Sequence, residues 1–69
     1  MKPAELLRRL RRFAARRGLD FEMSEGKNHT KVVLGGRRSV VGRHPKDLKT
    51  GTLNGILKQL GLKPEEIAE

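Results

Sequence analysis

The sequence has no cysteine, tryptophan or tyrosine, and its aromatic residues are two phenylalanines. Without cysteine the chain can form neither a disulfide nor a thiolate metal site, and we expect it to work in a reducing cytoplasm. With so few aromatic side chains, it lacks the stacking platform with which single-strand-binding modules hold bases. No apolar run approaches the ~20 residues of a membrane span, and arginines follow the first leucines, so we expect neither a membrane anchor nor a signal peptide.

Acidic residues are scarce as well. The 69 residues include sixteen Lys and Arg against eight Asp and Glu, a net charge of +8. Residues 1–63 hold all sixteen basic residues and five of the acids, a net charge of +11. This imbalance predicts a polyanion such as RNA, or an acidic protein, as partner. The length predicts one small domain, residues 1–69.

The first segment reads as an amphipathic helix. Pro3 suits the first turn, and Gly18 suits the cap at the end. Apolar residues recur at helical spacing, at Leu6, Leu10, Phe13 and Ala14. The polar arc carries Arg8, Arg9, Arg11, Arg12, Arg16 and Arg17. A solvated face is the simpler interpretation of each arginine, and contact with nucleic acid is the alternative.

Three strands are predicted next. Apolar and polar residues alternate over residues 19–24, which indicates a half-buried strand. A second strand, His29–Leu34, and a third, residues 37–42, flank Gly35-Gly36, which suits a two-residue hairpin loop. That loop would place Leu34 opposite Arg37 and Lys31 opposite Val40. One face would then hold Thr30, Val32, Leu34, Ser39 and Val41, and the open face His29, Lys31, Val33, Arg38 and Val40.

The remainder predicts a loop over residues 43–47 and a second helix. We expect Thr50 or Thr52 to cap this helix, and Gly55 inside it could permit close packing. Its apolar stripe is Leu53, Ile56, Leu57 and Leu60. Gly61 should end it with Leu62 completing a Schellman motif. Residues 64–66 should then form the first turn of a short terminal helix, which Ile67 anchors. The predicted class is α+β, in the order α-β-β-β-α, with both helices on one face of a three-stranded antiparallel sheet.

The stretch from Glu25 to Lys31 contains the main candidate for chemistry. His29 follows a glycine turn and has Lys27 and Lys31 on either side. The unperturbed pKa of histidine, about 6.5, allows proton transfer near neutral pH, and neighbouring cations could bind a phosphodiester. On spacing alone, a surface or packing role for one histidine is the more common interpretation. We expect no metal site, because His29 and His44 lack ligand spacing and no acidic pair accompanies them.

Several strings, in this order and spacing, resemble the HicA toxin family of mRNA interferases. They are residues 26–31 (GKNHTK), 36–40 (GRRSV), 43–45 (RHP) and 56–62 (ILKQLGL). The resemblance implies a double-stranded-RNA-binding-domain-like fold, a catalytic histidine that maps to His29, and a HicB-type antitoxin as partner. Lys27 stands where this family usually carries a small residue.

The resulting hypothesis is metal-independent cleavage of mRNA without a cofactor. His29 would act as general base, and the substrate-binding candidates are Lys27, Asn28, Lys31, Arg38 and Arg43. A second proton-transfer group is not evident, and His44 before Pro45 suits a structural loop. Two alternatives remain: a non-catalytic module that binds duplex RNA by shape, and a basic subunit that only binds an acidic protein.

Overall fold

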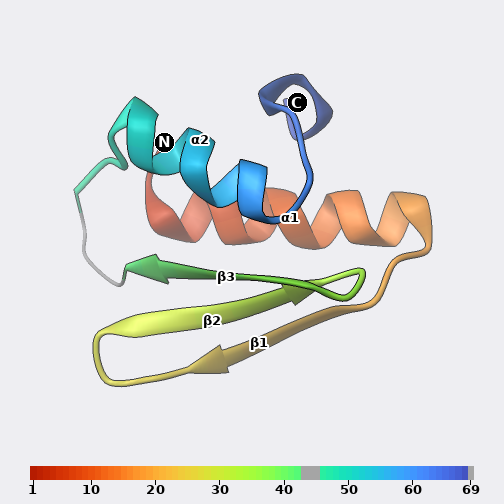
Figure 1. Ribbon diagram of the computed structural model, residues 1–69, viewed down its shortest axis with the longest axis horizontal. Coiled ribbons are helices and arrows are strands. Elements are labelled where there is room, and N and C mark those ends of the chain that lie inside the picture. Colours follow the sequence, from red (N-terminus) through yellow and green to blue (C-terminus); the bar gives the residue numbers. More distant parts are fainter. Residues whose placement is uncertain (43–45, 69) are drawn as a thin grey trace.

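The computed structural model describes residues 1–42 and 46–68. The predicted order is confirmed, with both helices on the same side of the sheet (Figure 1). The elements are α1 (Pro3–Arg17), β1 (Phe21–Glu25), β2 (His29–Leu34), β3 (Arg37–Gly42), α2 (Thr50–Gln59) and the 3₁₀ turn η1 (Pro64–Glu66). Of the predicted loop over residues 43–47, the first three residues lie outside the described ranges.

The sheet has the order β1-β2-β3, and both strand pairs are antiparallel. Gly35 and Gly36 have φ values of +55° and +87°, which match the two central positions of a type I′ turn. This turn places Leu34 opposite Arg37 and Lys31 opposite Val40, as predicted. Because side chains alternate along a strand, this register decides which residues face the helices.

The predicted faces of β2 and β3 are confirmed by burial. The helix-facing side chains are all at most 5% exposed: Thr30, Val32, Leu34, Ser39 and Val41. On the other face His29, Lys31, Arg38 and Val40 are exposed and Val33 is partly buried. The hydroxyl of Ser39 donates to the Gln59 side-chain oxygen at 2.6 Å. This bond ties the end of α2 to β3 on the helix-facing side of the sheet, and no described helix covers the other face.

The apolar stripe of α1 packs into the core as expected. Leu6 and Leu10 are fully buried, and Phe13 is 5% exposed. Gly18 ends the helix with φ +66°, and the Leu19 amide donates to the Ala14 carbonyl at 2.9 Å. This Schellman-type end turns the chain from α1 toward β1.

The start of α2 differs from the prediction. Lys49 is the N-cap residue, and no described side chain caps the helix. Thr50 and Thr52 both lie inside α2, so neither is placed to accept from its first free amides. Gly55 is also a correction, because it is exposed, and a Cβ built there would meet no described heavy atom within 4 Å other than its chain neighbours and its own helix backbone. Gly55 therefore permits no close packing.

The end of α2 is as predicted. Gly61 has φ +74°, and its amide donates to the Lys58 carbonyl at 3.1 Å. The Leu62 amide donates to the Leu57 carbonyl at 2.8 Å, which completes a Schellman motif. After η1, Ile67 is 5% exposed and belongs to the same buried cluster as Leu57. The C-terminal segment is thus held on the helical layer.

β1 is more exposed than a half-buried strand should be. It begins at Phe21, which is partly buried, whereas Leu19 and Met23 are 41% and 38% exposed. β1 is an edge strand, so its helix-facing side chains lie at the margin of the layer that α1 and α2 form. Among the described residues, no helix is long and apolar enough to cross a membrane.

Candidate active site

The turn between β1 and β2 fixes the backbone at His29. The Gly26 amide donates to the His29 carbonyl at 2.7 Å, and a Cβ added at Gly26 would lie 3.1 Å from that carbonyl oxygen. A larger residue at position 26 would therefore displace the His29 carbonyl and disturb this hydrogen bond. Lys27 and Asn28 form the exposed remainder of the turn, directly before His29.

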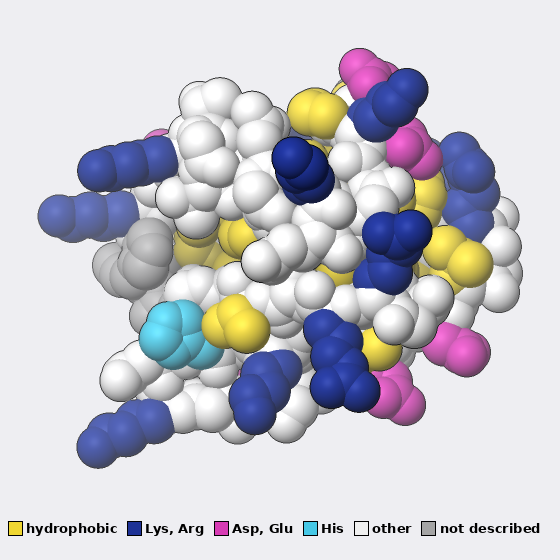
Figure 2. All heavy atoms as spheres, in the orientation of Figure 1, with side chains coloured by type: hydrophobic (Ala, Val, Ile, Leu, Met, Phe, Trp, Pro, Cys, Tyr) yellow, Lys and Arg dark blue, Asp and Glu magenta, His cyan; other side chains and the backbone are white. Residues whose placement is uncertain are grey.

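His29 is the first residue of the central strand and lies on the open face of the sheet. Its partner across β3 is Gly42, which has no side chain, so nothing at the opposite position covers the imidazole. In Figure 2 a histidine side chain lies at the surface beside a hydrophobic side chain, with lysine and arginine side chains nearby. A substrate can therefore approach the imidazole directly from solvent.

Two predicted substrate-binding residues lie on the same face. Lys31 is two residues beyond His29 along β2, roughly 7 Å away in an extended strand. Arg38 lies on β3 opposite Val33, which follows Lys31 by two residues along β2, so Arg38 is farther from His29 than Lys31 is. The structure thus brings together His29, Lys31 and Arg38, with Lys27 and Asn28 in the adjoining turn. Arg43 and His44 lie outside the described residues.

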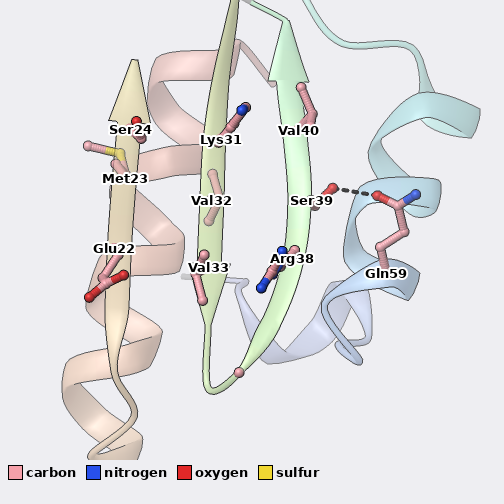
Figure 3. A pocket seen from close by; sticks show the side chains of 11 residues that line it. Glu22, Met23, Ser24, Lys31, Val32, Val33, Arg38, Ser39, Val40 and Gln59 are labelled. Atoms are coloured by element: carbon pink, nitrogen blue, oxygen red, sulfur yellow. Dashed lines mark hydrogen bonds between the residues drawn. The ribbon is translucent and has the colours of Figure 1, made fainter. Parts of the chain in front are cut away.

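A shallow groove runs over this face of the sheet (Figure 3). On the open face its lining comes from all three strands: Glu22, Ser24, Lys31, Val33, Arg38 and Val40. Glu22 and Ser24 are not among the site residues predicted from the sequence. They reach the groove because β1 pairs with β2 so that Glu22 is opposite Val33 and Ser24 is opposite Lys31. They could have been found from the sequence because they occupy polar positions in the alternating stretch of residues 19–24.

The arginines of α1 lie in the helical layer, away from this groove. Several of them make contacts within the chain: Arg9 pairs with Glu5 at 2.9 Å, and Arg17 lies 3.9 Å from Glu66. The Arg17 guanidinium also lies 5.0 Å from the centre of the Phe13 ring. Such contacts agree with the simpler interpretation of these arginines as a solvated face.

The donors on the open face suit a phosphodiester. Lysine and arginine side chains there can bind phosphate oxygens, and an imidazole can exchange a proton beside them. Among residues 1–42 and 46–68, no group of three or more His, Cys, Asp or Glu side chains could hold a metal ion. The chemistry that these described side chains can supply is proton transfer and charge stabilisation.

Comparison with known proteins identifies the family of this chain. Residues 7–62 match the family model described as the HicA toxin of bacterial toxin–antitoxin. "Probable mRNA interferase HicA" of Escherichia coli O157:H7 and "Probable mRNA interferase toxin HicA" of strain K12 are each 47% identical over 53 residues, covering 75% of this chain and 88% of theirs. "Probable mRNA interferase HicA 1" of Photorhabdus laumondii is 45% identical over 42 residues, covering 59% of this chain and 74% of its own. No solved structure matches significantly. The chain belongs to the HicA toxin family.

Proposed function

We propose that this protein is the toxin of a toxin–antitoxin pair and that it cleaves mRNA as a metal-independent endoribonuclease with His29 as the catalytic residue. Three findings support this function. The chain belongs to the HicA family, and its relatives are named mRNA interferases. His29 and the cations Lys31 and Arg38 share one exposed sheet face, and this shared face is the observation that carries the proposal.

The proposed reaction is an intramolecular transesterification, in which the 2′-oxygen of a nucleotide attacks the phosphorus of its own 3′-phosphate. The imidazole of His29 takes the proton of the 2′-hydroxyl as that oxygen attacks phosphorus. The bond from phosphorus to the 5′-oxygen of the next nucleotide then breaks, and solvent, which reaches this open face, protonates the leaving oxygen. The products are a 2′,3′-cyclic phosphate and a 5′-hydroxyl.

The cations around His29 would stabilise the charge that develops on phosphorus. Lys31 lies on the same face one row from His29, and Lys27 lies in the turn before it. The Asn28 side-chain amide can donate to a phosphate oxygen, Arg43 would bind a flanking phosphate, and Arg38 would contact a flanking nucleotide. Fixed positive groups of this kind act without a metal ion.

A nuclease that acts on cellular mRNA has to be held inactive, and we propose that a HicB-type antitoxin does so. The net charge of +8 would steer an acidic partner onto the basic surface. Such a partner would block RNA by covering the open face with His29, Lys31 and Arg38. This places inhibitor and substrate in competition for one surface.

The test is cleavage of end-labelled RNA by the purified protein. His29→Ala should abolish cleavage and toxicity and should leave the fold intact, because the side chain is exposed. Excess EDTA should not inhibit the wild type. His44→Ala serves as the matched control and should stay active. Full activity of His29→Ala, or loss of wild-type activity on chelation, would contradict the mechanism.

A further inference from the structure

Glu22 is an acidic residue on the face that we assign to RNA. It is exposed on β1 and lines the same groove as Lys31 and Arg38. A carboxylate in this position repels phosphate, and within the ~8 Å screening length of physiological salt it weakens the attraction of nearby cations. Phosphate binding therefore does not explain Glu22. A carboxylate gains from RNA only where it accepts hydrogen bonds, and the exocyclic and ring N–H groups of bases are such donors.

The row that contains Glu22 has the form of a base subsite. Glu22 is opposite Val33, and Val33 is opposite Arg38, so these three side chains lie across the three strands (Figure 3). Adjacent strands are about 4.8 Å apart, which separates the Glu22 and Arg38 backbones by roughly 10 Å. Val33 provides an apolar floor between them. A planar base laid on Val33 would have a carboxylate at one edge and a guanidinium at the other.

Guanine is the base whose two edges fit this arrangement. Its Watson–Crick edge presents N1–H and N2–H donors, which a carboxylate can accept together. Its other edge presents the O6 and N7 acceptors, which arginine binds in bidentate fashion. Cytosine and adenine each offer a single exocyclic amino group to the carboxylate, and uracil offers one ring N–H. The carboxylate of Glu22 and the guanidinium of Arg38 together thus favour guanine over the other three nucleobases.

We propose that Glu22, Val33 and Arg38 form a guanine subsite that selects where this enzyme cuts RNA. The inference rests on the proposed function and extends it from RNA in general to a preferred base. The Val33 row is four residues along β2 from His29, roughly 13 Å. At that distance the subsite holds a base that flanks the scissile phosphate rather than the nucleotide that reacts.

The test is cleavage of oligoribonucleotides in which one guanine is moved along an otherwise guanine-free sequence. Wild-type protein should cut at a fixed offset from the guanine. Glu22→Gln keeps the size of the side chain and replaces one acceptor by a donor, so its selectivity for guanine over adenine should fall at least about tenfold. The matched control is Glu25→Gln, which removes the same charge from the same strand on its other face. That variant should keep the selectivity.

A change in the RNA tests the same contact from the other side. Inosine lacks the 2-amino group of guanine, so replacing guanine by inosine should reduce wild-type cleavage at the site and should matter little to Glu22→Gln. An unchanged selectivity in Glu22→Gln, or an equal inosine effect in both proteins, would overturn the subsite. Cleavage at sites unrelated to guanine would also overturn it.

Binding separates failure of the subsite from failure of the proposed function. Fluorescence anisotropy with His29→Ala protein measures affinity for guanine-containing and adenine-containing oligonucleotides without cleavage. Selective binding that depends on Glu22, in a protein whose wild type cuts no RNA, would retain the subsite and refute the nuclease function. RNA cleavage together with binding that does not distinguish guanine from adenine would retain the nuclease function and refute the subsite. If neither cleavage nor selective binding is found, both proposals are refuted.

Discussion

Replacing Leu57 by alanine tests how the fold is held together. Leu57 is 1% exposed, and it lies in α2 against the cluster that includes Leu10 and Val41. The substitution removes three buried carbon atoms, worth about 2.4 kcal/mol at ~0.8 kcal/mol each. The cavity that remains raises the cost to about 3–5 kcal/mol. At roughly 0.05–0.15 kcal/mol per residue, a chain of this length has a total stability of about 3–10 kcal/mol.

Thermal unfolding followed by circular dichroism measures this cost. For a domain of this size 1 kcal/mol corresponds to roughly 4–8 °C, so Leu57→Ala should lower the Tm by at least about 12 °C or leave the protein unfolded. Leu19→Ala is the control, since Leu19 is 41% exposed, and it should shift the Tm by a few degrees. A midpoint for Leu57→Ala as close to wild type as that of Leu19→Ala would refute the packing described for α2.

Two further predictions concern the open face. Lys31→Ala should weaken RNA binding and reduce the log–log slope of affinity against salt by about 0.7, the value of one single-strand phosphate contact. The control Lys58→Ala, on α2, should leave the slope unchanged. Equal slopes for wild type and Lys31→Ala would show that the RNA binds elsewhere. A HicB-type antitoxin should bury roughly 800 Å² of this protein, about a sixth of its 4910 Å² surface, including His29, and His29→Ala should still bind it. Chemical modification of His29, read by mass spectrometry, should stop in the complex; a histidine that stays reactive there would show that inhibition works some other way.

The sheet could be predicted from sequence because short-range rules decide it. Two glycines with alternating residues on both sides specify a type I′ hairpin and hence the pairing of Lys31 with Val40. That pairing alone places His29, Lys31 and Arg38 on one face. The end of α2 followed in the same way, since a Schellman motif needs only glycine and the apolar residue after it.

The features that could not be predicted depend on contacts distant in sequence. Thr50 and Thr52 both had the chemistry of a cap, but the chain enters α2 from Leu48, whose amide donates to the Met1 carbonyl at 2.8 Å. This contact with the other end of the chain was not visible in the local sequence. The exposure of Met23 likewise depends on how far the helical layer extends sideways over β1.

The place of Glu22 in the groove required the pairing of β1 with β2. The turn at residues 26–28 sets that register, and its length was not a recognisable hairpin signature. The alternation around Glu22 shows that it faces away from Phe21, but it does not say which residue of β2 lies opposite. Candidate residues within one hairpin were therefore predicted, whereas those contributed by the neighbouring strand were missed.

The uncovered face of the sheet has a consequence for the shape of the substrate. An enzyme that cuts a polymer internally has to admit it sideways, because the ends of a long messenger can be far from the bond that breaks. Both helices lie on one side of the sheet (Figure 1), and His29 lies on the other face, opposite Gly42 on β3. A strand can settle across this face and leave it again without an end being threaded through the protein. The arrangement therefore suits a substrate of any length, including one that is already covered elsewhere along its chain.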